Sequence, residues 1–422
     1  MQAGRGSQHE PRSPEGRLRS AGHGGGTGYR LRVALDDLDA FRALLTPLGR
    51  QALAEAAEVI GNDPVAAATR LRKTYDAALT SAALTQAGLR ARAREKFGAD
   101  AEVMYFTPHG LEQSTRAEVA AHRAARLAAL RPGEVSVADA CCGIGGDLIA
   151  LARAGCRVDA VDLDPLTAAV AAANAAALGL SPQASVRTAD AATLDPAAYD
   201  VLFADPARRS GRGRTFDPEA YQPPWPVVLA MIGRAKAACL KVAPGIPYEF
   251  IPQEAEAEWV SFRGEVKEAV LWMTEDRRIT RRATLLPYGE TLTATGAQAE
   301  TGPVGRYLYE PDGAAVRAHL VGEVAEMIGG RLIDPQIAYL TGDDPIETPW
   351  ASCHEVTEVM PFSLKRLRAA LRDRRVGTLT IKKRGSAVDV ERLRKDLRLS
   401  GGNAATVVLT RVGDRPIAIL CG

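Results

Sequence analysis

Cysteine is scarce in this chain, and its few cysteines are not spaced as metal ligands or disulfide partners usually are. Six of the 422 residues are cysteines, and none of them forms a Cys-x-x-Cys pair. Zinc sites commonly use that close spacing, and small disulfide frameworks use more cysteines in a shorter chain. Cys353, His354 and Glu355 are adjacent, but neighbours in sequence rarely converge on one ion. We therefore predict no metal site and no disulfide framework.

Long apolar runs are also missing. No segment approaches the roughly 20 apolar residues that a membrane-spanning helix needs, and the opening Met-Gln-Ala-Gly-Arg-Gly lacks the apolar core of a secretory signal. With 46% hydrophobic and 25% charged residues, the chain is long enough for one large α/β domain and one or two small ones. We expect a soluble cytoplasmic protein with no membrane contact.

Charge is unevenly distributed, although the net charge is only +2. Residues 363–422 contain 15 Lys or Arg against 5 Asp or Glu, a net charge of +10, and residues 1–30 contain 5 Arg against 2 Glu, a net charge of +3. The remainder must then carry −11. Such segregation suggests that the C-terminal segment binds a polyanion, and nucleic acid is the simplest candidate. A merely soluble surface is the alternative.

Four consecutive predicted strands each end at an aspartate: Asp139, Asp162, Asp190 and Asp205. The first is followed by a glycine-rich turn and an apolar helix, which together predict a nucleotide-binding corner. The turn alone would fit any dinucleotide-binding βαβ unit. The repeated aspartates are more informative than the glycines.

Asp139 distinguishes between two classes of cofactor. A dinucleotide places its phosphates at a helix N-terminus, where a carboxylate just before the loop would repel them. S-adenosylmethionine (SAM) has no phosphate, and its ammonium group would be attracted by Asp139. Asp162 then suits the ribose hydroxyls and Asp190 the adenine amine. We predict SAM as the cofactor, with a dinucleotide as the alternative.

Residues 105–287 resemble the class I SAM-dependent methyltransferases, and in particular the RNA-directed branch that includes trimethylguanosine synthase. The likeness rests on Thr107-Pro108 before a helix, on Cys-Gly-x-Gly-Gly at 142–146, and on Asp-x-Asp-Pro at 162–165 followed by Ala-x-x-Asn at 171–174. It implies an α/β fold with a Rossmann-like sheet. We predict the following cofactor-binding residues: Thr107, Asp139, Cys141, Gly143, Gly145, Gly146, Asp162, Leu163, Asp190 and Ala191.

The chain divides by composition into five parts. We expect a disordered tail at 1–28, a helical module at 31–104, a methyltransferase domain at 105–300, a connecting region at 301–350 and a small domain at 351–422. Within the methyltransferase domain, one helix is expected at 110–130. Its Arg116, Arg123 and Arg126 are expected to form a solvated face, with RNA contact as the alternative. Residues 259–272 and 281–286 are expected to be two strands, matching the antiparallel pair that closes the class I sheet.

The last part is predicted as helix, strand, helix, strand, strand, with Ser363 and Asp389 as helix caps. Ile381-Lys-Lys-Arg-Gly385 and the strand at 407–411 resemble the THUMP-like domain of a group of bacterial methyltransferases, and this resemblance implies a small α+β domain. True THUMP domains hold structured RNA, and the resemblance implies that role here by analogy. We predict that Lys382, Lys383 and Arg384 bind substrate; exposed charge without a specific role is the alternative.

The motif after the fourth predicted strand concerns the methyl acceptor. Enzymes that methylate exocyclic amines usually show Asp or Asn, Pro, Pro and an aromatic residue, whereas this chain reads Asp205-Pro206-Ala207-Arg208-Arg209. We predict Asp205 and Pro206 as catalytic residues and Arg208 and Arg209 as ligands of substrate phosphates. Tyr221 or Trp225 is a candidate for the missing stacking ring, with a core position as the alternative for each.

An Asp-Pro-x-Arg motif also occurs in RNA uracil C5 methyltransferases, which need a cysteine nucleophile after the next strand. Cys239 precedes the expected strand end, so covalent methylation at uracil C5 is the less favoured hypothesis. The favoured function is methylation of a nucleobase nitrogen in structured RNA such as tRNA or rRNA. The alternatives are a small-molecule or protein methyltransferase, or a SAM-binding RNA-binding protein without catalysis. Which RNA and which oligomeric state remain open at this stage.

Overall fold

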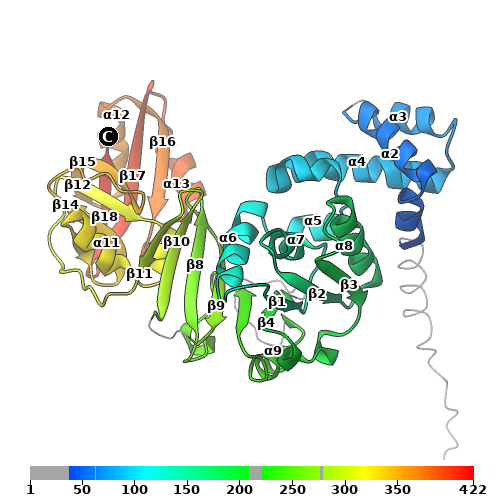
Figure 1. The fold of residues 1–422 in the computed structure, drawn as a ribbon. Helices are drawn as coiled ribbons and strands as arrows, with labels where there is room; N and C mark the ends of the chain where they lie inside the picture. Colours follow the sequence, from blue (N-terminus) through cyan, green and yellow to red (C-terminus); the bar gives the residue numbers. More distant parts are fainter. Residues whose placement is uncertain (1–37, 62, 209–220, 276–278) are drawn as a thin grey trace, which may run out of the picture. The chain divides into compact units, whose positions relative to one another are not determined.

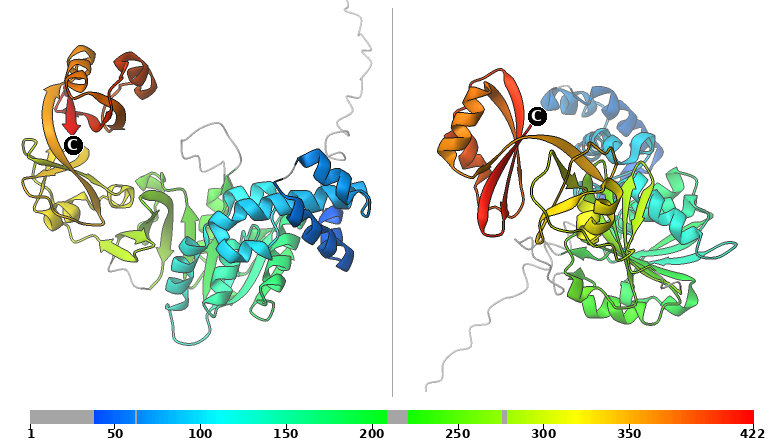
Figure 2. Two further views of the ribbon diagram at one scale, coloured as in Figure 1. Left: turned by 90° about the horizontal axis from the view of Figure 1, so that it is seen from above. Right: turned by 90° about the vertical axis from the view of Figure 1, so that its left-hand side faces the viewer.

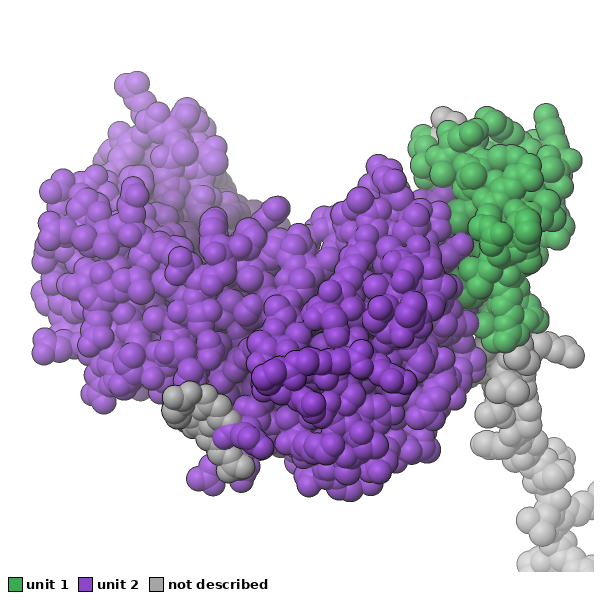
Figure 3. All heavy atoms as spheres, viewed as in Figure 1, with its two compact units in different colours: residues 1–84 green, residues 85–422 purple. Residues whose placement is uncertain are grey.

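The computed structural model describes residues 38–61, 63–208, 221–275 and 279–422. The predicted tail at 1–28 lies outside the described residues. The chain divides into two compact units, residues 1–84 and residues 85–422, which Figure 3 colours separately.

The first unit is helical, as expected for the N-terminal module. It contains α2 (Pro47–Val59), α3 (Pro64–Leu71) and the beginning of α4 (Ala77–Phe97). Thr46 and Asp63 cap α2 and α3, and each cap is followed by proline at the first helical position. Proline suits that position because it has no N–H to leave unsatisfied. The Asp63 carboxylate accepts from the N–H of Ala66 at 2.8 Å.

The larger unit contains a nine-stranded sheet, whose order is β11-β10-β8-β9-β7-β4-β1-β2-β3 (Figure 1). Its strands are β1 (Ser136–Asp139), β2 (Arg157–Asp162), β3 (Ala184–Thr188), β4 (Val201–Ala204), β7 (Ala238–Val242), β8 (Glu256–Phe262), β9 (Glu265–Met273), β10 (Arg281–Leu286) and β11 (Glu290–Thr293). From β3 to β7 every pairing is parallel. The carboxyl ends of these strands therefore meet at one edge of the sheet, as the class I fold requires.

The expectation of one strand at 259–272 is wrong. This stretch forms a hairpin, in which β8 and β9 pair antiparallel and Phe262 lies opposite Glu265. The two turn residues, Arg263 and Gly264, have φ values of 53° and 81°, as a type I′ turn requires. The hairpin itself is the antiparallel pair of the class I sheet, and β10 joins outside it, parallel to β8.

The expectation of one helix at 110–130 is also wrong. This segment is divided between two helices, α5 (Pro108–Gln113) and α6 (Ala117–Ala128). Lys96 donates hydrogen bonds to the carbonyl oxygens of Leu111, Glu112 and Ser114, at 2.7, 2.7 and 2.9 Å. These carbonyls are thus satisfied without continuing the helix.

Helices cover both faces of the first sheet. In Figure 1, α6, α7 (Gly146–Arg153) and α8 (Pro165–Ala177) lie on one side of the parallel strands and α9 (Trp225–Ile232) on the other. The short strands β5 (Ala207–Arg208) and β6 (Tyr221–Gln222) form a separate pair. Among the described helices, none combines the length and apolar character needed to cross a membrane.

A second sheet of seven strands has the order β13-β14-β12-β15-β18-β17-β16. Its strands are β12 (Tyr307–Pro311), β13 (Arg331–Asp334), β14 (Ile337–Gly342), β15 (Ala351–Pro361), β16 (Val376–Lys383), β17 (Asn403–Val412) and β18 (Arg415–Cys421). Two helices, α12 (Leu364–Asp373) and α13 (Val390–Leu397), pack on one side of the C-terminal strands (Figure 2). The predicted order of helix, strand, helix, strand, strand is present in 363–422.

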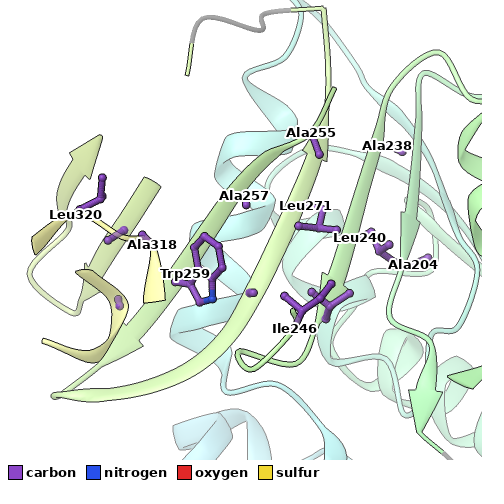
Figure 4. Packing of buried hydrophobic residues seen from close by; sticks show 14 of the residues in the cluster. Ala204, Ala238, Leu240, Ile246, Ala255, Ala257, Trp259, Leu271, Ala318 and Leu320 are labelled. Carbon is purple, nitrogen blue, oxygen red and sulfur yellow. The ribbon is translucent and has the colours of Figure 1, made fainter. Parts of the chain in front are cut away.

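Residues 301–350 connect the two sheets. Helix α10 (Gly313–Arg317) packs on β8, β9 and β10 of the first sheet, and α11 (Val321–Ile328) contacts β14 of the second. Ala318 and Leu320, which lie between these two helices, join a core with Trp259 (Figure 4). The strands within 301–350 belong to the second sheet, because β15 pairs with β12 along its first half and with β18 along its second. The second sheet therefore continues across residue 350, and the domain limits stay a prediction.

Candidate cofactor and catalytic site

The glycine-rich loop after β1 adopts a backbone that side chains disfavour. Gly143 and Gly145 have φ values of 55° and 88°, in the left-handed region that glycine enters without strain. The N–H of Gly145 donates to the carbonyl of Cys142 at 2.9 Å, and Gly145 caps α7. The loop thus turns directly into the N-terminus of α7, where backbone N–H groups favour a carboxylate ligand.

Asp139, the last residue of β1, is fully buried. Its Oδ1 accepts a 3.4 Å hydrogen bond from the N–H of Cys141, whereas its Oδ2 is buried with no hydrogen-bond partner among the described residues. Burial, followed by the negative charge of Asp147, raises the pKa of Asp139 well above the usual carboxyl value. Burying a hydrogen-bond acceptor without a donor lowers the stability of the fold, unless a ligand supplies the donor. The ammonium group of SAM fits that requirement.

Asp162, the last residue of β2, is tied to the glycine loop. Its Oδ2 accepts from the N–H of Gly143 and its Oδ1 from the N–H of Asp164, both at 3.0 Å. Burial raises the pKa of Asp162, and these backbone hydrogen bonds oppose the rise. An ionised carboxylate has about four acceptor positions, so Asp162 retains capacity for ribose hydroxyls. Leu163 beside it is 55% exposed and offers an apolar surface.

Asp190 lies two residues beyond the end of β3 and is exposed. Its Oδ1 caps a short 3-10 turn by accepting from the N–H of Ala192 at 2.9 Å. Ala191, the first residue of that turn, is buried. This places a carboxylate and an apolar residue where an adenine amine and ring are predicted to bind.

The four strand-end aspartates converge around Cys141. Burial raises the pKa of its thiol well above the usual value, and the carboxylates of Asp139, Asp205, Asp162 and Asp190 raise it further. The parallel pairing of β1 with β2 and β4, and of β2 with β3, brings the carboxyl ends of these strands, at or just after which the four aspartates lie, to one edge of the sheet.

Two amide side chains that the sequence analysis assigned no role position the segment before Thr107. Asn174 of α8 accepts from the N–H of Tyr105 at 2.6 Å and donates to the carbonyl oxygens of Tyr105 at 3.0 Å and Ile144 at 2.9 Å. Gln86 of α4 makes the corresponding pair of hydrogen bonds with the backbone of Phe106. Asn174 belongs to the motif behind the family resemblance, but only the fold reveals these contacts.

Thr107 itself caps α5, and its hydroxyl accepts from the N–H of Gly110 at 2.9 Å. A Cβ on Gly110 would lie 2.3 Å from the Cγ2 of Ile144 in the glycine loop. The absence of a side chain at Gly110 therefore lets the start of α5 approach the loop closely.

Asp205, directly after β4, forms an ion pair with Lys241 of β7. The strand register explains the pair, since Ala204 lies opposite Leu240 and the next residues are therefore level. Burial alone would lower the pKa of Lys241, but the carboxylates of Asp205, Asp147 and Glu268 raise it above its usual value. The pairing thus favours the charged form of Lys241. Lys241 was not predicted as a site residue, although a lysine inside an apolar strand was the available signal.

Beneath this pair lies a buried network of charges. Arg123 of α6 is 1% exposed and forms ion pairs with Asp147 of α7 and Glu268 of β9. Burial raises the pKa of Glu268 to about 7 in spite of the opposing effect of Arg123 and Lys241. Burial would also raise the pKa of Asp147, but Arg123 and Lys241 lower it below the usual value.

The expectation that the arginines of 110–130 form a solvated or RNA-contacting face is therefore wrong. Besides Arg123, Arg126 binds Glu256 and Glu258 of β8 and lies 4.1 Å from the ring centroid of Trp272. Arg116 pairs with Glu95 at 2.8 Å. These side chains join α6 to its neighbours because β8 and β9 present carboxylates to it, which the sequence spacing does not reveal.

The candidate nucleophile Cys239 and the candidate stacking rings of Tyr221 and Trp225 all lie in the core. Cys239 is 1% exposed within β7, and burial raises the pKa of its thiol well above the usual value, which disfavours a role as nucleophile. Tyr221 and Trp225 are buried, with ring centroids 5.8 Å apart. The core alternative therefore holds for both rings.

The predicted substrate-binding residues differ in their surroundings. Lys382 and Arg384 both pair with Glu310 of β12, and Arg384 also donates to the carbonyl of Ala338. Lys383 is exposed and donates to the carbonyl of Val388 at 2.9 Å. Arg209 and the side chain of Arg208 lie outside the described residues.

Within the described part of the chain, no three His, Cys, Asp or Glu side chains are grouped as ligands of a metal ion.

Three family models match the chain. A methyltransferase domain matches residues 137–207, a THUMP domain-like family matches residues 351–422, and a domain of unknown function (DUF8688) matches residues 37–93. The first two matches coincide with the segments whose motifs suggested them.

Two similar proteins have a comparable length. An uncharacterised SAM-dependent methyltransferase of Mycobacterium tuberculosis, present in strains CDC 1551 and H37Rv, is 40% identical over 316 residues, which are 73% of this chain and 85% of that protein. The crystal structure of a candidate methyltransferase from Porphyromonas gingivalis W83 covers 88% of this chain and 98% of its own, with a TM-score of 0.72 and 22% identity. At that identity, the second similarity shows the fold.

Proposed function

Since this chain belongs to the SAM-dependent methyltransferases, we propose that it methylates a nucleobase nitrogen in structured RNA such as tRNA or rRNA. The observation that carries the proposal is the Asp205–Lys241 pair, located directly after β4 among the aspartates that suit the cofactor. The THUMP-like segment and its net charge of +10 favour a nucleic acid as the partner. An RNA substrate also favours a cytoplasmic location.

In this proposal Asp139 binds the ammonium of SAM, Asp162 the ribose hydroxyls and Asp190 the adenine amine. Asn174 and Gln86 hold the segment that leads to Thr107 in place against the glycine loop. When bound, SAM would supply a sulfonium methyl group: the acceptor nitrogen would bond to the methyl carbon as the carbon–sulfur bond breaks, the sulfur would leave as a neutral thioether with the bonding pair, and the methylated amine would then lose a proton to solvent. The protein therefore contributes mainly alignment of the two reacting atoms.

Asp205 is placed to accept a hydrogen of an exocyclic amine, together with the backbone carbonyl of Pro206. The ion pair with Lys241 limits rotation of the Asp205 carboxylate. A carboxylate held in this way orients the nitrogen lone pair toward the methyl carbon and stabilises the positive charge that develops on nitrogen. We propose Arg208 and Arg209, which directly follow, as contacts for RNA phosphates.

We also propose that the turn of Lys382, Lys383 and Arg384 attracts RNA at longer range. Glu310 neutralises only one of these three cations, so the turn keeps a net positive charge. Lys383 is the member most available for a direct contact.

The test is transfer of radiolabelled methyl groups from SAM to total RNA from a strain of the source organism that lacks this protein. The Asp205→Ala protein is the control. Label in one RNA size class that is absent with the control supports the proposal and provides material for mapping the nucleotide. Absence of label, alongside SAM binding, would contradict it. Transfer to a small molecule or a protein would then identify the correct class of substrate, and no transfer at all would indicate a SAM-binding protein without catalysis.

A further inference from the structure

The C-terminal ends of α12 and α13 enclose a pocket that is dominated by arginine. Its volume is about 340 Å³, and its lining includes Arg368, Arg372, Arg375 and Arg398, together with the backbone of residues 399–402. Among the described residues that line it there is no carboxylate. Arg372, Arg375 and Arg398 are exposed and Arg368 is half-buried, and four cations around one small concavity give a local positive potential that attracts an anion.

Three of the four pocket arginines have no partner among the described residues. Within the described residues, the side chains of Arg372, Arg375 and Arg398 have no hydrogen bond or ion pair, and the Nε of Arg368 is buried without a partner. Outside the pocket, three neighbouring arginines are paired: Arg374 with Glu358 at 2.7 Å, Arg392 with Asp396 at 3.7 Å, and Arg394 with the carbonyl of Leu379 at 2.8 Å. Arg366 of α12 also has no hydrogen bond or ion pair among the described residues, but it lies outside the pocket, so what distinguishes the pocket is that several unpaired arginines line one concavity.

Arginine near a helix C-terminus often only compensates the helix dipole. That role is already filled here by two side chains. Arg368 donates through Nη2 to the carbonyl of Asp396 at the end of α13, and Arg374 donates to the carbonyl of Ala370 in α12. Helix capping therefore leaves Arg372, Arg375 and Arg398 unexplained.

The backbone of the pocket is already fixed. Arg375 and Arg398 have φ values of 52° and 51°, a strained conformation for residues other than glycine that persists only where the surroundings impose it. A Cβ on Gly401 would lie 1.8 Å from the carbonyl oxygen of Arg375, so the loop packs directly on the start of β16. The N–H of Asn403 donates to the same carbonyl at 3.0 Å.

We infer that this pocket binds a phosphate group of the RNA substrate. Guanidinium groups match phosphate oxygens in pairs and are weakly hydrated, and a preformed backbone avoids the entropy of ordering it on binding. The inference rests on the proposed function, because it takes RNA as the source of the phosphate. The pocket lies at the opposite end of β16 from Lys382 and Lys383, about 20 Å away at the usual rise per residue.

The test compares two full-length proteins that each lose two positive charges from α12 and α13. Arg372→Ala with Arg398→Asn changes the pocket, and asparagine tolerates the left-handed backbone at 398. Arg366→Ala with Arg392→Ala removes exposed charges that do not line the pocket. Affinity for fluorescently labelled bulk tRNA is measured as a function of salt. Affinity for SAM, measured by calorimetry, confirms that each protein is folded.

Loss of two phosphate contacts should reduce the slope of log Kd against log salt by about 1.5 for the pocket variant, while the control keeps the parental slope. Equal slopes in the two variants would overturn the inference, even if the parent methylates RNA. Binding of inorganic phosphate by the parent, with no change in tRNA binding by the pocket variant, would assign the pocket to a free anion and overturn it too. A slope that falls in the pocket variant and not in the control, without methyl transfer to any RNA, would support phosphate binding by the pocket. It would contradict only the proposed function.

Discussion

At the scale of single residues, Asp139 is the group whose ionisation depends most on the cofactor. Its buried Oδ2 has no partner among the described residues, and burial raises its pKa well above the usual carboxyl value. Binding of an ammonium favours the ionised form and so lowers that pKa again. Cofactor binding is therefore linked to release of a proton from Asp139.

We expect the affinity for SAM to rise with pH, from the ordinary carboxyl range near about 4 up to the raised pKa of Asp139, and to be constant above it. Below the raised pKa, the free protein must lose a proton before the ammonium can bind, which weakens affinity there. Asp139→Asn should weaken binding about 10- to 100-fold and remove this pH dependence. Calorimetry at several pH values measures both effects. A pH profile unchanged by the substitution would show that Asp139 does not receive the ammonium.

The Asp205–Lys241 pair permits a second prediction at this scale. Asp205→Ala should leave SAM affinity nearly unchanged and lower the rate of methyl transfer about 100-fold, because the acceptor nitrogen is no longer oriented. The single substitution also leaves the largely buried Lys241 unpaired, which destabilises the protein.

The double variant Asp205→Ala with Lys241→Met separates the two effects. It should regain much of the lost resistance to urea, since no unpaired charge remains, but it should not regain methyl transfer. Full turnover in either variant would remove Asp205 from the reaction.

At the scale of elements, Asn174 joins three segments of the cofactor site. It links α8 to the backbone of Tyr105 and to Ile144 in the glycine loop, and it is completely buried. Gln86 holds the adjacent Phe106 in a similar way but makes no such hydrogen bond to the loop. The two amides therefore form a matched pair.

Asn174→Ala should lower the free energy of unfolding by about 2–3 kcal/mol, because buried backbone groups lose their partners. Gln86→Ala should lower it by a similar amount. Only Asn174→Ala should also weaken SAM binding strongly, since only Asn174 fixes the carbonyl of Ile144. Urea denaturation and calorimetry test the pair. Equal losses of SAM affinity in both variants would show that the loop does not depend on Asn174.

At the scale of the whole molecule, the C-terminal strands complete a core that begins in the preceding segment. Leu308, Ile333 and Tyr339 are fully buried against Val408 and Ile419. The second half of β15 pairs with β18. Residues 363–422 are thus not a separable attachment, although their family model begins at residue 351.

Deletion of 363–422 should therefore expose apolar surface and lower the melting temperature, because each uncovered side chain costs about 2 kcal/mol. Binding of a hydrophobic dye and calorimetry measure the two effects. A truncated chain that melts like the parent would contradict this account of the second core. If this prediction holds, the truncated protein would lose activity because it is destabilised, so that loss would not show that RNA is the substrate. The two double-arginine variants leave the chain at full length and therefore still test RNA binding.

The features that could be predicted from the amino-acid sequence are those that follow from local patterns. The class I SAM-dependent methyltransferase fold, the cofactor and the THUMP-like segment were predicted and are confirmed. The prediction succeeded because a strand ending in aspartate, a glycine turn and a helix are contiguous in the chain. Parallel pairing then brings successive strand ends to one edge whatever the rest of the fold does.

Contacts between side chains that are distant in sequence, by contrast, depend on how the chain packs. The pairing of Lys241 with Asp205 follows from strand register, and the burial of Arg123 follows from the carboxylates that α7 and β9 bring to it. Glu310 reaches Lys382 across 72 positions of sequence, so a turn that looks like a free basic patch is partly neutralised. Residues with like charges in sequence have different surroundings because burial and ion pairing are properties of the packed chain.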